Sequence, residues 1–308
     1  MEHRKLGRSD RSVSLVGLGT NNFGGRIDLE ASRKVIHAAL DHGVTHFDTA
    51  DIYGNSGGSE TVIGQVLGAR RGEVVLATKF GKPMAGNLEE HRGSRRYVMS
   101  AVEASLARLQ TDRIDLLTMH EPDPSTPIEE TFRALEELKK AGKVLHIACS
   151  NFLADEIDDA TAEANRLGIE GFLAAQDEYS LTHRDHEKTL FPALKANGLN
   201  LVPYFPLGGG ALTGKYRKGQ PHPTGTRHKD ASTRFLAPHV DTIEALHMFA
   251  DDHGHTLLEL AMSWLAANPL VASIIAGATK PEQVAANAKA VEWKLSAADL
   301  AEIDRITR

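Results

Sequence analysis

Four residues whose side chains can donate or stabilise a proton lie at or just after the ends of short apolar segments. Asp48, Lys79 and His120 each end such a segment, and Tyr53 follows Asp48 closely. A phenol normally titrates near about 10, and a neighbouring ammonium group lowers this pKa. If the four side chains meet, Asp48 would hold Lys79. Lys79 would then make Tyr53 a proton donor to a carbonyl oxygen at neutral pH.

Each of these residues also has an ordinary structural interpretation. Asp48 could cap the turn after its strand, and His120 could be a hydrogen-bonded residue at a strand end. Lys79 could extend from the rim so that only its ammonium group reaches water. All four residues would fall at successive strand ends by chance much less often than any one of them would. The pattern therefore favours an acid–base site.

The segments that carry these residues belong to a regular alternation along the chain. Eight apolar segments predict strands, at 13–19, 44–48, 74–79, 115–120, 144–150, 173–178, 199–204 and 271–277. Amphipathic segments with helical spacing predict helices at 31–43, 58–69, 95–110, 128–141, 153–167 and 186–197. The long Gly/Pro-rich, basic segment 205–238 is typical of a functional or mobile loop, with a disordered insertion as the alternative.

Eight strand–helix units predict an α/β protein with a parallel sheet, and at this length a (β/α)8 TIM barrel. In a barrel the carboxyl ends of all strands meet at one mouth, which is where function is placed. The alternative is a doubly wound open sheet with a G-x-G-x-x-G motif at its first helix. The chain has Gly17 and Gly19 but Asn22 at the third position, which argues against that motif. No Pro/Gly/Ser-rich linker divides the chain, so we expect one domain, residues 1–308.

Composition narrows the setting and the partners. The 308 residues carry a formal net charge of −6, which argues against a nucleic-acid partner because phosphates need a basic face. Cys149 is the single cysteine, so no internal disulfide can form and a cytoplasmic setting is expected. We see no apolar signal segment at the start of the chain and no stretch that suits a membrane span.

Other chemistries have weaker support in the sequence. The chain has 15 histidines but no H-E-x-x-H motif and no cysteine cluster, so we expect no bound metal. No serine lies in a G-x-S-x-G motif, which argues against that kind of hydrolase. Cys149 adjoins Ser150 but points to the other side of its strand, so we expect it to be packed in the core.

Several motifs, in order along nearly the whole chain, resemble those of the aldo–keto reductase family. The segment HFDTADIYG at 46–54 is similar to the family's first signature. The later motifs are ATKFG (77–81), TMHEPDP (118–124), ACSNF (148–152), QDEYS (176–180), PYFPLGGGALTGKY (203–216) and AGATKPEQVAAN (276–287). The N-terminal segment is similar to the family's short hairpin, which closes the barrel floor.

This resemblance implies a set of functional residues. Asp48, Tyr53, Lys79 and His120 match the family's catalytic tetrad, in which the tyrosine protonates the carbonyl oxygen while a nicotinamide delivers hydride to the carbon. His120 would orient the carbonyl. The resemblance implies that the cofactor is held by Thr20, Ser150, Asn151, Gln176, Tyr204, Phe205, Leu207, Gly208, Gly210, Lys215, Arg227, Gly277, Thr279, Gln283 and Asn287.

Two departures bear on the cofactor. Phe205 stands where the family often has a serine, which removes a hydroxyl that could meet a phosphate. Thr279 stands where many relatives carry a basic residue, which weakens the prediction of a 2′-phosphate site. Arg227 and Lys280 could supply positive charge there instead. We therefore expect NADPH as the cofactor and keep NADH as an alternative.

The implied activity is the reduction of aldehydes or ketones to alcohols by an NADPH-dependent reductase, with a small carbonyl compound as substrate. One alternative is an NADPH-binding regulatory protein with weak turnover, like the family's potassium-channel subunits. The other is an NAD-linked sugar or alcohol dehydrogenase. Phe23, Met84 and His91 are expected to line the substrate pocket. The sequence leaves the substrate and the oligomeric state open.

Overall fold

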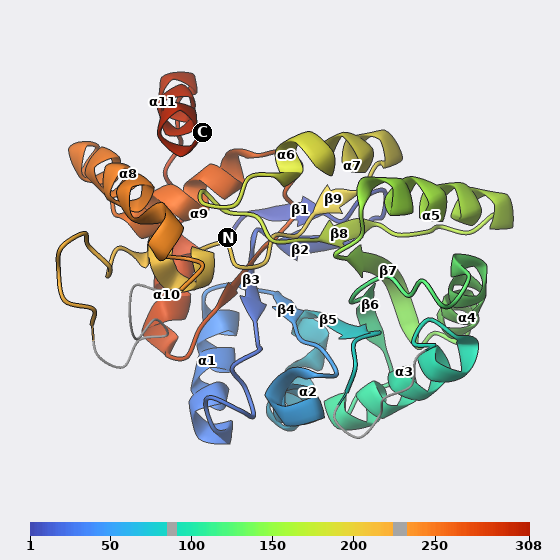
Figure 1. Cartoon of the computed structure of the whole chain (residues 1–308). Coiled ribbons are helices and arrows are strands. Elements are labelled where there is room, and N and C mark those ends of the chain that lie inside the picture. The colour runs from blue at the N-terminus through green and yellow to red at the C-terminus, as the bar shows by residue number, and fades with distance from the viewer. Residues whose placement is uncertain (85–90, 224–232) are drawn as a thin grey trace.

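The computed structural model describes residues 1–84, 91–223 and 233–308. Its centre is a curved sheet of eight parallel strands (Figure 1). In spatial order they are β10 (Ile274–Gly277), β3 (Val16–Gly19), β4 (His46–Asp48), β5 (Val75–Phe80), β6 (Ile114–Met119), β7 (Val144–Ser150), β8 (Ala174–Gln176) and β9 (Asn200–Leu201). A parallel bridge between Leu201 and Val271, just before β10, closes the ring. The predicted (β/α)8 barrel is confirmed.

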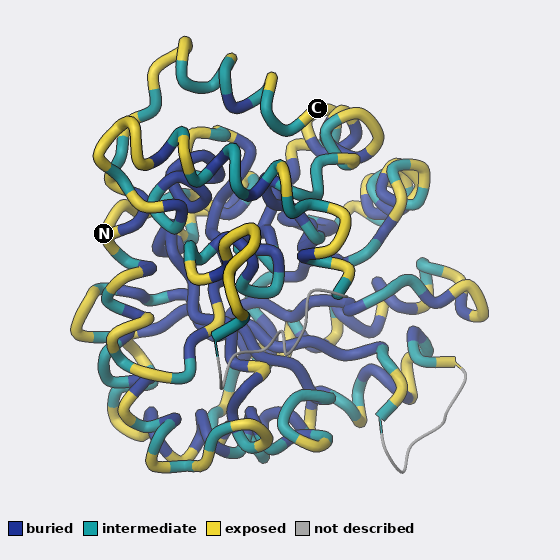
Figure 2. Tube along the Cα trace, turned by 60° about the vertical axis from the view of Figure 1, so that its left-hand side comes forward, coloured by how far each residue is buried: buried dark blue, intermediate teal, exposed yellow. Residues whose placement is uncertain are grey.

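Helices surround the strands on the outside, as the amphipathic pattern predicts. In α4, for example, Phe132, Leu135 and Leu138 are buried on one face, with acidic residues in the first turn and basic residues in the last. Figure 2 shows the buried trace at the centre and the exposed segments around it. The helices are α1 (Leu29–Asp41), α2 (Tyr53–Leu67), α3 (Arg95–Leu109), α4 (Ile128–Lys140), α5 (Ala154–Leu167), α6 (His186–Thr189), α7 (Phe191–Asn197), α8 (Val240–Asp252), α9 (Leu257–Ala267), α10 (Pro281–Lys289) and α11 (Ala297–Thr307).

A short N-terminal hairpin closes the floor of the barrel, as the resemblance implied. Its strands β1 (His3–Lys5) and β2 (Ser12–Ser14) pair antiparallel. Leu6 and Val13 are fully buried in a cluster with side chains from the first residues of barrel strands, such as Val75 of β5. The floor is therefore filled by apolar packing, and the opposite, carboxyl-terminal mouth is left for function.

Two predicted elements are divided in the structure. The predicted strand 13–19 forms the end of the hairpin strand β2 and then β3, with a bend at Leu15 between the two. Just before this bend, the Ser14 hydroxyl accepts hydrogen bonds from the amides of Thr45 and His46. The predicted helix 186–197 is split into α6 and α7 near Leu190. Pro192, at the start of α7, has no amide hydrogen to continue the ladder from α6.

In the part of the chain that the structure describes, no helix is long and apolar enough to cross a membrane. In the described part of the segment 205–238 lies the 3₁₀ helix η2 (Gly208–Thr213), and η3 (Ala237–His239) begins at its end; η1 (Gly68–Glu73) follows α2. Within η2 the glycines at 208, 209 and 210 all have positive φ, a conformation that glycine adopts without strain.

Candidate active site

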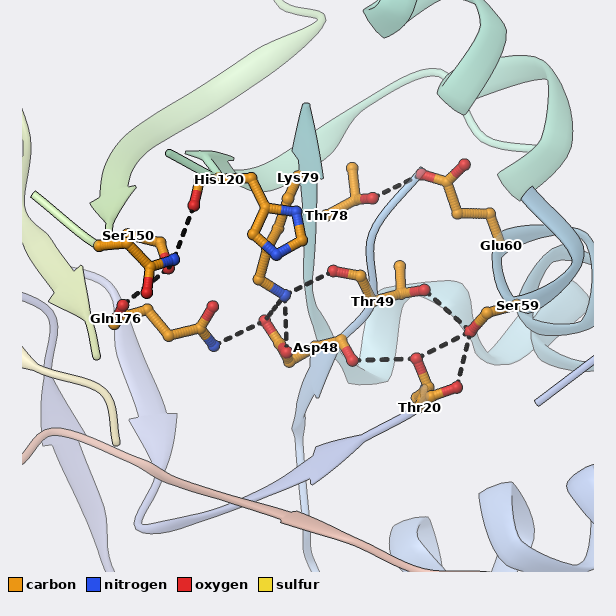
Figure 3. Close-up of polar contacts among 11 residues, drawn as sticks. Thr20, Asp48, Thr49, Ser59, Glu60, Thr78, Lys79, His120, Ser150 and Gln176 are labelled. Carbon is orange, nitrogen blue, oxygen red and sulfur yellow. Dashed lines mark hydrogen bonds and ion pairs between the residues drawn. The ribbon is translucent and has the colours of Figure 1, made fainter. Parts of the chain in front are cut away.

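The barrel topology brings the predicted acid–base residues to one end. Asp48 is the last residue of β4, Lys79 lies one residue before the end of β5, and His120 directly follows β6. Tyr53 is the first residue of α2. Because β4, β5 and β6 are adjacent and parallel, their carboxyl ends meet at the mouth of the barrel. Figure 3 shows Lys79 and Gln176 both pointing at Asp48, with the His120 ring close by.

A buried ion pair lies at the centre of this group. The Lys79 ammonium donates hydrogen bonds to the two Asp48 carboxylate oxygens at 2.7 and 2.8 Å, and a third to the Thr49 carbonyl at 2.7 Å. Gln176 adds a bond from its amide to Asp48 at 3.0 Å. Burial alone would lower the pKa of Lys79, but Asp48 and Tyr53 raise it by more, so that its pKa lies above the ordinary value. Lys79 is therefore a fixed positive charge.

Hydroxyl groups behind the ion pair hold the end of β4 in place. The Thr20 hydroxyl donates to the Asp48 backbone carbonyl at 2.9 Å. The Ser59 hydroxyl accepts a bond from Thr49 and donates to the Thr20 carbonyl, both at 2.9 Å (Figure 3). All three hydroxyl-bearing residues are fully buried. This network fixes the loop between Asp48 and Tyr53 against strand β3 and helix α2.

Tyr53 lies between the ammonium group and the imidazole. Lys79 Nζ is 5.1 Å from the centre of the Tyr53 ring, and the His120 ring meets Tyr53 edge-on at 5.9 Å. Burial raises the pKa of Tyr53, and the charge and hydrogen bond of Lys79 oppose this rise without cancelling it. The sequence-based expectation of a net lowered pKa is therefore wrong, because it neglected the desolvation of the phenol. Tyr53 carries its proton at neutral pH.

His120 is uncharged in this environment. Burial, together with the charges of Lys79 and Lys82, lowers its pKa to about 2. Its Nδ1 is buried and has no hydrogen-bond partner among the described residues. A neutral imidazole can donate a hydrogen bond from one nitrogen, but it is a poor source of a proton. Between the two, Tyr53 is therefore the better acid.

A cavity of about 680 Å³ opens above these residues. Asp48, Tyr53 and His120 line one part of it, and the rest extends along the segment after β9 to the start of α10. Most residues predicted to hold the cofactor line it: Thr20, Ser150, Asn151, Gln176, Tyr204, Phe205, Leu207, Gly210, Lys215, Gly277, Thr279 and Gln283.

Two of these residues are fixed to each other beside the catalytic group. Asn151 has a left-handed backbone, with φ of 61°. Its side-chain amide donates to the His120 carbonyl at 2.9 Å, and its side-chain oxygen accepts a bond from the Tyr204 hydroxyl at 2.8 Å. The Tyr204 ring is thereby held at the cavity wall. Such hydrogen bonds preorganise a flat aromatic surface for a ring-shaped ligand.

Two of the residues predicted to hold the cofactor, Asn287 and Gly208, do not line the cavity. Asn287 is 6% exposed on α10 and points into the core, although Gln283, one turn earlier, lines the cavity. The helix packs against α1, α9 and β3, and Val284 and Asn287 are its buried residues. Gly208 faces Thr182 rather than the cavity, whereas Gly209, which the sequence analysis did not single out, lines it. Arg227 lies outside the described residues.

The residues predicted for the substrate pocket do not line the cavity either. Phe23 is fully buried in the hydrophobic core, because its large apolar ring is packed between the barrel and the helices. His91 is exposed and contacts the Ser125 hydroxyl at 3.0 Å. Met84 is half-buried, and the cavity is lined from its segment by Lys82 instead.

The cavity also receives residues from the loop at 21–26 and from the end of η2. Asn21, Asn22 and Arg26 line it in place of Phe23, as does Thr213. The polarity of the residues in the 21–26 loop could have indicated which of them line the cavity, because polar side chains face water at low cost whereas Phe23 is stabilised by burial. Cys149 is fully buried, as expected, and burial raises its pKa. Its thiol faces the carbonyl of Ala174, away from this chemistry.

A second buried carboxyl group, Asp51, lies beside the site. Neither of its oxygens accepts a hydrogen bond of normal geometry from a described residue. Burial, and then the charge of Glu60, raise its pKa from 3.8 to about 7, while Arg108 and the Ile52 amide partly offset this rise. Asp51 therefore exchanges a proton in the folded protein near neutral pH.

Asp51 should make the protein less stable as pH rises. The unfolded chain releases this proton near pH 3.8 and the folded chain near pH 7. Between these values the folded state binds more protons, so the free energy of unfolding falls as pH rises, by on the order of 2–4 kcal/mol in total. Asp51→Asn removes this titration. Urea unfolding at pH 5 and pH 8 should show the variant gaining stability relative to the parent at the higher pH. If the free energy of unfolding changed equally between pH 5 and pH 8 in the parent, in Asp51→Asn and in the exposed control Asp252→Asn, the raised pKa of Asp51 would be contradicted.

The chain is similar to known proteins over nearly its whole length. Residues 15–308 match the model of the Aldo/keto reductase family. A probable voltage-gated potassium channel subunit beta from Arabidopsis thaliana is 37% identical, over 95% of this chain and 92% of the relative. The uncharacterized oxidoreductase YrpG of Bacillus subtilis is also 37% identical, over 96% and 92%. The L-glyceraldehyde 3-phosphate reductase of Escherichia coli K12 is 32% identical, over 99% and 92%.

Proposed function

The chain belongs to the aldo/keto reductase family of oxidoreductases, and on this basis we propose that it reduces aldehydes or ketones to alcohols, with NADPH as hydride donor and Tyr53 as proton donor. The observation that carries the proposal is the arrangement of Tyr53 between the buried Lys79–Asp48 pair and a neutral His120. This arrangement faces a cavity of about 680 Å³, a volume typical of cofactor and ligand sites.

Tyr53 acts as the general acid. Its O–H bond breaks as the proton passes to the carbonyl oxygen of the substrate, and Tyr53 is left as a phenolate. The Lys79 ammonium, 5.1 Å from the ring centre, stabilises this negative charge as it develops. Asp48 holds the ammonium group in place, so the charge needs no rearrangement during the reaction. A buried, preorganised charge of this kind contributes more than the same charge in water.

His120 positions the carbonyl group. Because its pKa is lowered to about 2, it is neutral and can donate a hydrogen bond without competing with Tyr53 for the role of acid. The Tyr53 and His120 rings meet edge-on, so both polar ends can approach one substrate oxygen. Positioning of this kind lowers the entropy cost of reaching the transition state.

The residues of the cavity fit a nicotinamide dinucleotide. Ser150, Asn151 and Gln176 offer amide and hydroxyl groups for the carboxamide, and Tyr204 offers a fixed aromatic face for the ring. Glycine backbone with positive φ and Lys215 would meet the pyrophosphate, and the start of α10 would meet the adenosine. When bound, the reduced cofactor supplies the hydride that adds to the carbonyl carbon.

We expect NADPH to bind roughly ten- to a hundredfold more tightly than NADH, the range given by one charge-assisted hydrogen bond. Lys280 lines the cavity at the N-terminal end of α10, where a phosphate is also favoured by the helix dipole. The Thr279 hydroxyl already donates to Gln283 at 3.1 Å, so Lys280 should contribute more than Thr279. Fluorescence titration of both cofactors measures the ratio.

Substitution on the same helix tests the source of this preference. Lys280→Gln should weaken NADPH binding and leave NADH binding unchanged. Lys289→Gln, in the last turn of α10, is the matched control and should change neither. Equal affinities of the parent protein for the two cofactors would argue for an NAD-linked dehydrogenase instead.

The activity itself is tested by mixing the protein with NADPH and a panel of aldehydes and ketones, and following the loss of NADPH absorbance. The similarity to channel subunits supports a second candidate, a regulatory protein that binds NADPH with weak turnover. Tight NADPH binding without consumption of NADPH by any carbonyl compound would favour that candidate. Steady turnover that depends on the carbonyl compound supports the reductase, for which we propose a cytoplasmic setting because the single cysteine can form no internal disulfide.

A further inference from the structure

The charged side chains that line the cavity are mostly positive. Among the described residues they are Arg26, Lys82, Lys215 and Lys280, together with the carboxylate of Asp48, which is neutralised by Lys79. The chain as a whole has a net charge of −6. A positive cavity in an acidic protein concentrates anionic ligands there.

The four cations are not all placed to serve the same ligand. Lys215 and Lys280 lie on the segments that would meet the phosphates of the dinucleotide. Lys82 lies on another element, three residues beyond Lys79 on the segment that follows β5. Its charge acts on His120, whose pKa it helps to lower after burial and Lys79. Lys82 is therefore close to the end of the cavity where the carbonyl group would react.

Lys82 has no side-chain partner among the described residues. Glu121 lies just beyond the end of β6, the strand next to β5. It is bound by Arg92 at 3.2 Å and not by Lys82. Arg92 is held in addition by the Gly81 carbonyl, which accepts from its Nε at 2.7 Å. Within the described part of the chain, this acid is thus already paired with another cation, and the Lys82 ammonium is available to a ligand in the cavity.

Arg26 adds to the positive potential near Tyr53. The loop of Arg26 packs against the first turn of α2, next to Tyr53. A Cβ placed on Gly25 would lie 3.6 Å from the Cα of Gly54. No side-chain hydrogen bond or ion pair of Arg26 is present within residues 1–84, 91–223 and 233–308. Among the described residues that line this end of the cavity, Arg26 and Lys82 are cations on two loops, and the carboxylate of Asp48 is paired with Lys79.

We propose that the substrate is a small carbonyl compound that carries an anionic group, a carboxylate or a phosphate, and that Lys82 binds this group. The proposal rests on the proposed reductase function and narrows its substrate class. Lys82 would be a specificity residue: it binds the substrate away from the reacting carbon and takes no part in proton transfer. Its loss should therefore raise KM for anionic substrates more than it lowers kcat.

The test compares matched pairs of aldehydes that differ in charge. One pair is 4-carboxybenzaldehyde and its methyl ester, and the other is 4-formylphenyl phosphate and 4-methoxybenzaldehyde. In Lys82→Gln, kcat/KM should fall roughly ten- to a hundredfold for the anionic member of at least one pair, and less than about twofold for the neutral members. The pair with the larger loss identifies carboxylate or phosphate. Lys82→Arg should retain most of the preference. Equal losses for charged and neutral members overturn the proposal.

A binding measurement keeps the proposal testable without turnover. Calorimetric titration of 4-(hydroxymethyl)benzoate and of 4-(hydroxymethyl)phenyl phosphate into the protein saturated with NADP⁺ should give tighter binding of at least one in the parent than in Lys82→Gln. The same affinity of both proteins for each anion overturns the proposal, as does a loss of NADP⁺ affinity alone in the variant. If the anion preference is found but no aldehyde is reduced, the anion site stands and the proposed reductase function fails.

Discussion

Tyr53→Phe should reduce the rate of carbonyl reduction by roughly 10² to 10⁴-fold, the usual contribution of a general acid. The substitution removes one oxygen from a ring that lies 5.9 Å from His120 and 5.1 Å from Lys79 Nζ, so the packing of the ring is kept. The phenol acts on the transition state and not on the cofactor. We therefore expect kcat to fall while the affinity for NADPH stays within about twofold.

Single-turnover kinetics and a fluorescence titration of NADPH measure these two quantities separately. Tyr97→Phe is the matched control, because Tyr97 is also a buried phenol and does not line the cavity. Its hydroxyl makes a long contact of 3.5 Å with the Lys82 carbonyl. Parent-like turnover in Tyr53→Phe would show that another group supplies the proton.

Asp48→Asn should destabilise the protein by about 3–5 kcal/mol, because it leaves the buried Lys79 ammonium without its counter-charge. Lys79 is 1% exposed, and its ammonium group donates to both carboxylate oxygens of Asp48, at 2.7 and 2.8 Å. Activity should also fall, since the ammonium group would lose its fixed position beneath Tyr53. Urea unfolding at neutral pH, together with turnover, measures both effects.

The double variant Asp48→Asn/Lys79→Met separates the two effects. It leaves no buried charge, so much of the lost stability should return. Activity should stay low, because no cation remains to stabilise the Tyr53 phenolate. Recovery of activity along with stability would contradict the role given to Lys79. An unchanged stability in Asp48→Asn would contradict the structural role of the ion pair.

The sequence was sufficient to predict the barrel and the meeting of its four acid–base side chains. Asp48, Lys79 and His120 each end an apolar strand, and a parallel barrel has only one mouth at which such ends can meet. The contact between Lys79 and Asp48 follows from the pairing of adjacent strands. For this reason a pattern along the chain was enough to predict a group of residues that are far apart in sequence.

Other features depend on three-dimensional packing that local patterns do not reveal. Phe23 lies in a loop at the mouth of the barrel, yet its ring turns into the core and leaves Arg26 at the cavity. The pKa of Tyr53 is set by two opposing effects, because burial raises it and the Lys79 charge lowers it. The sequence indicated the position of Lys79 but not how deeply the phenol is buried. Asn287 was expected to hold the cofactor together with Gln283, but it is buried within the fold and does not line the cavity.

The central claim is that this site transfers hydride from the cofactor to a carbonyl carbon with Tyr53 as the acid. The most direct measurement uses NADPH that carries deuterium on the transferable position of nicotinamide C4, with an aldehyde that the parent protein consumes. Mass spectrometry of the alcohol should show one deuterium on the former carbonyl carbon with the parent protein, and almost no alcohol with Tyr53→Phe. An alcohol without deuterium from the cofactor, or labelled alcohol formed equally fast by Tyr53→Phe, would contradict this claim.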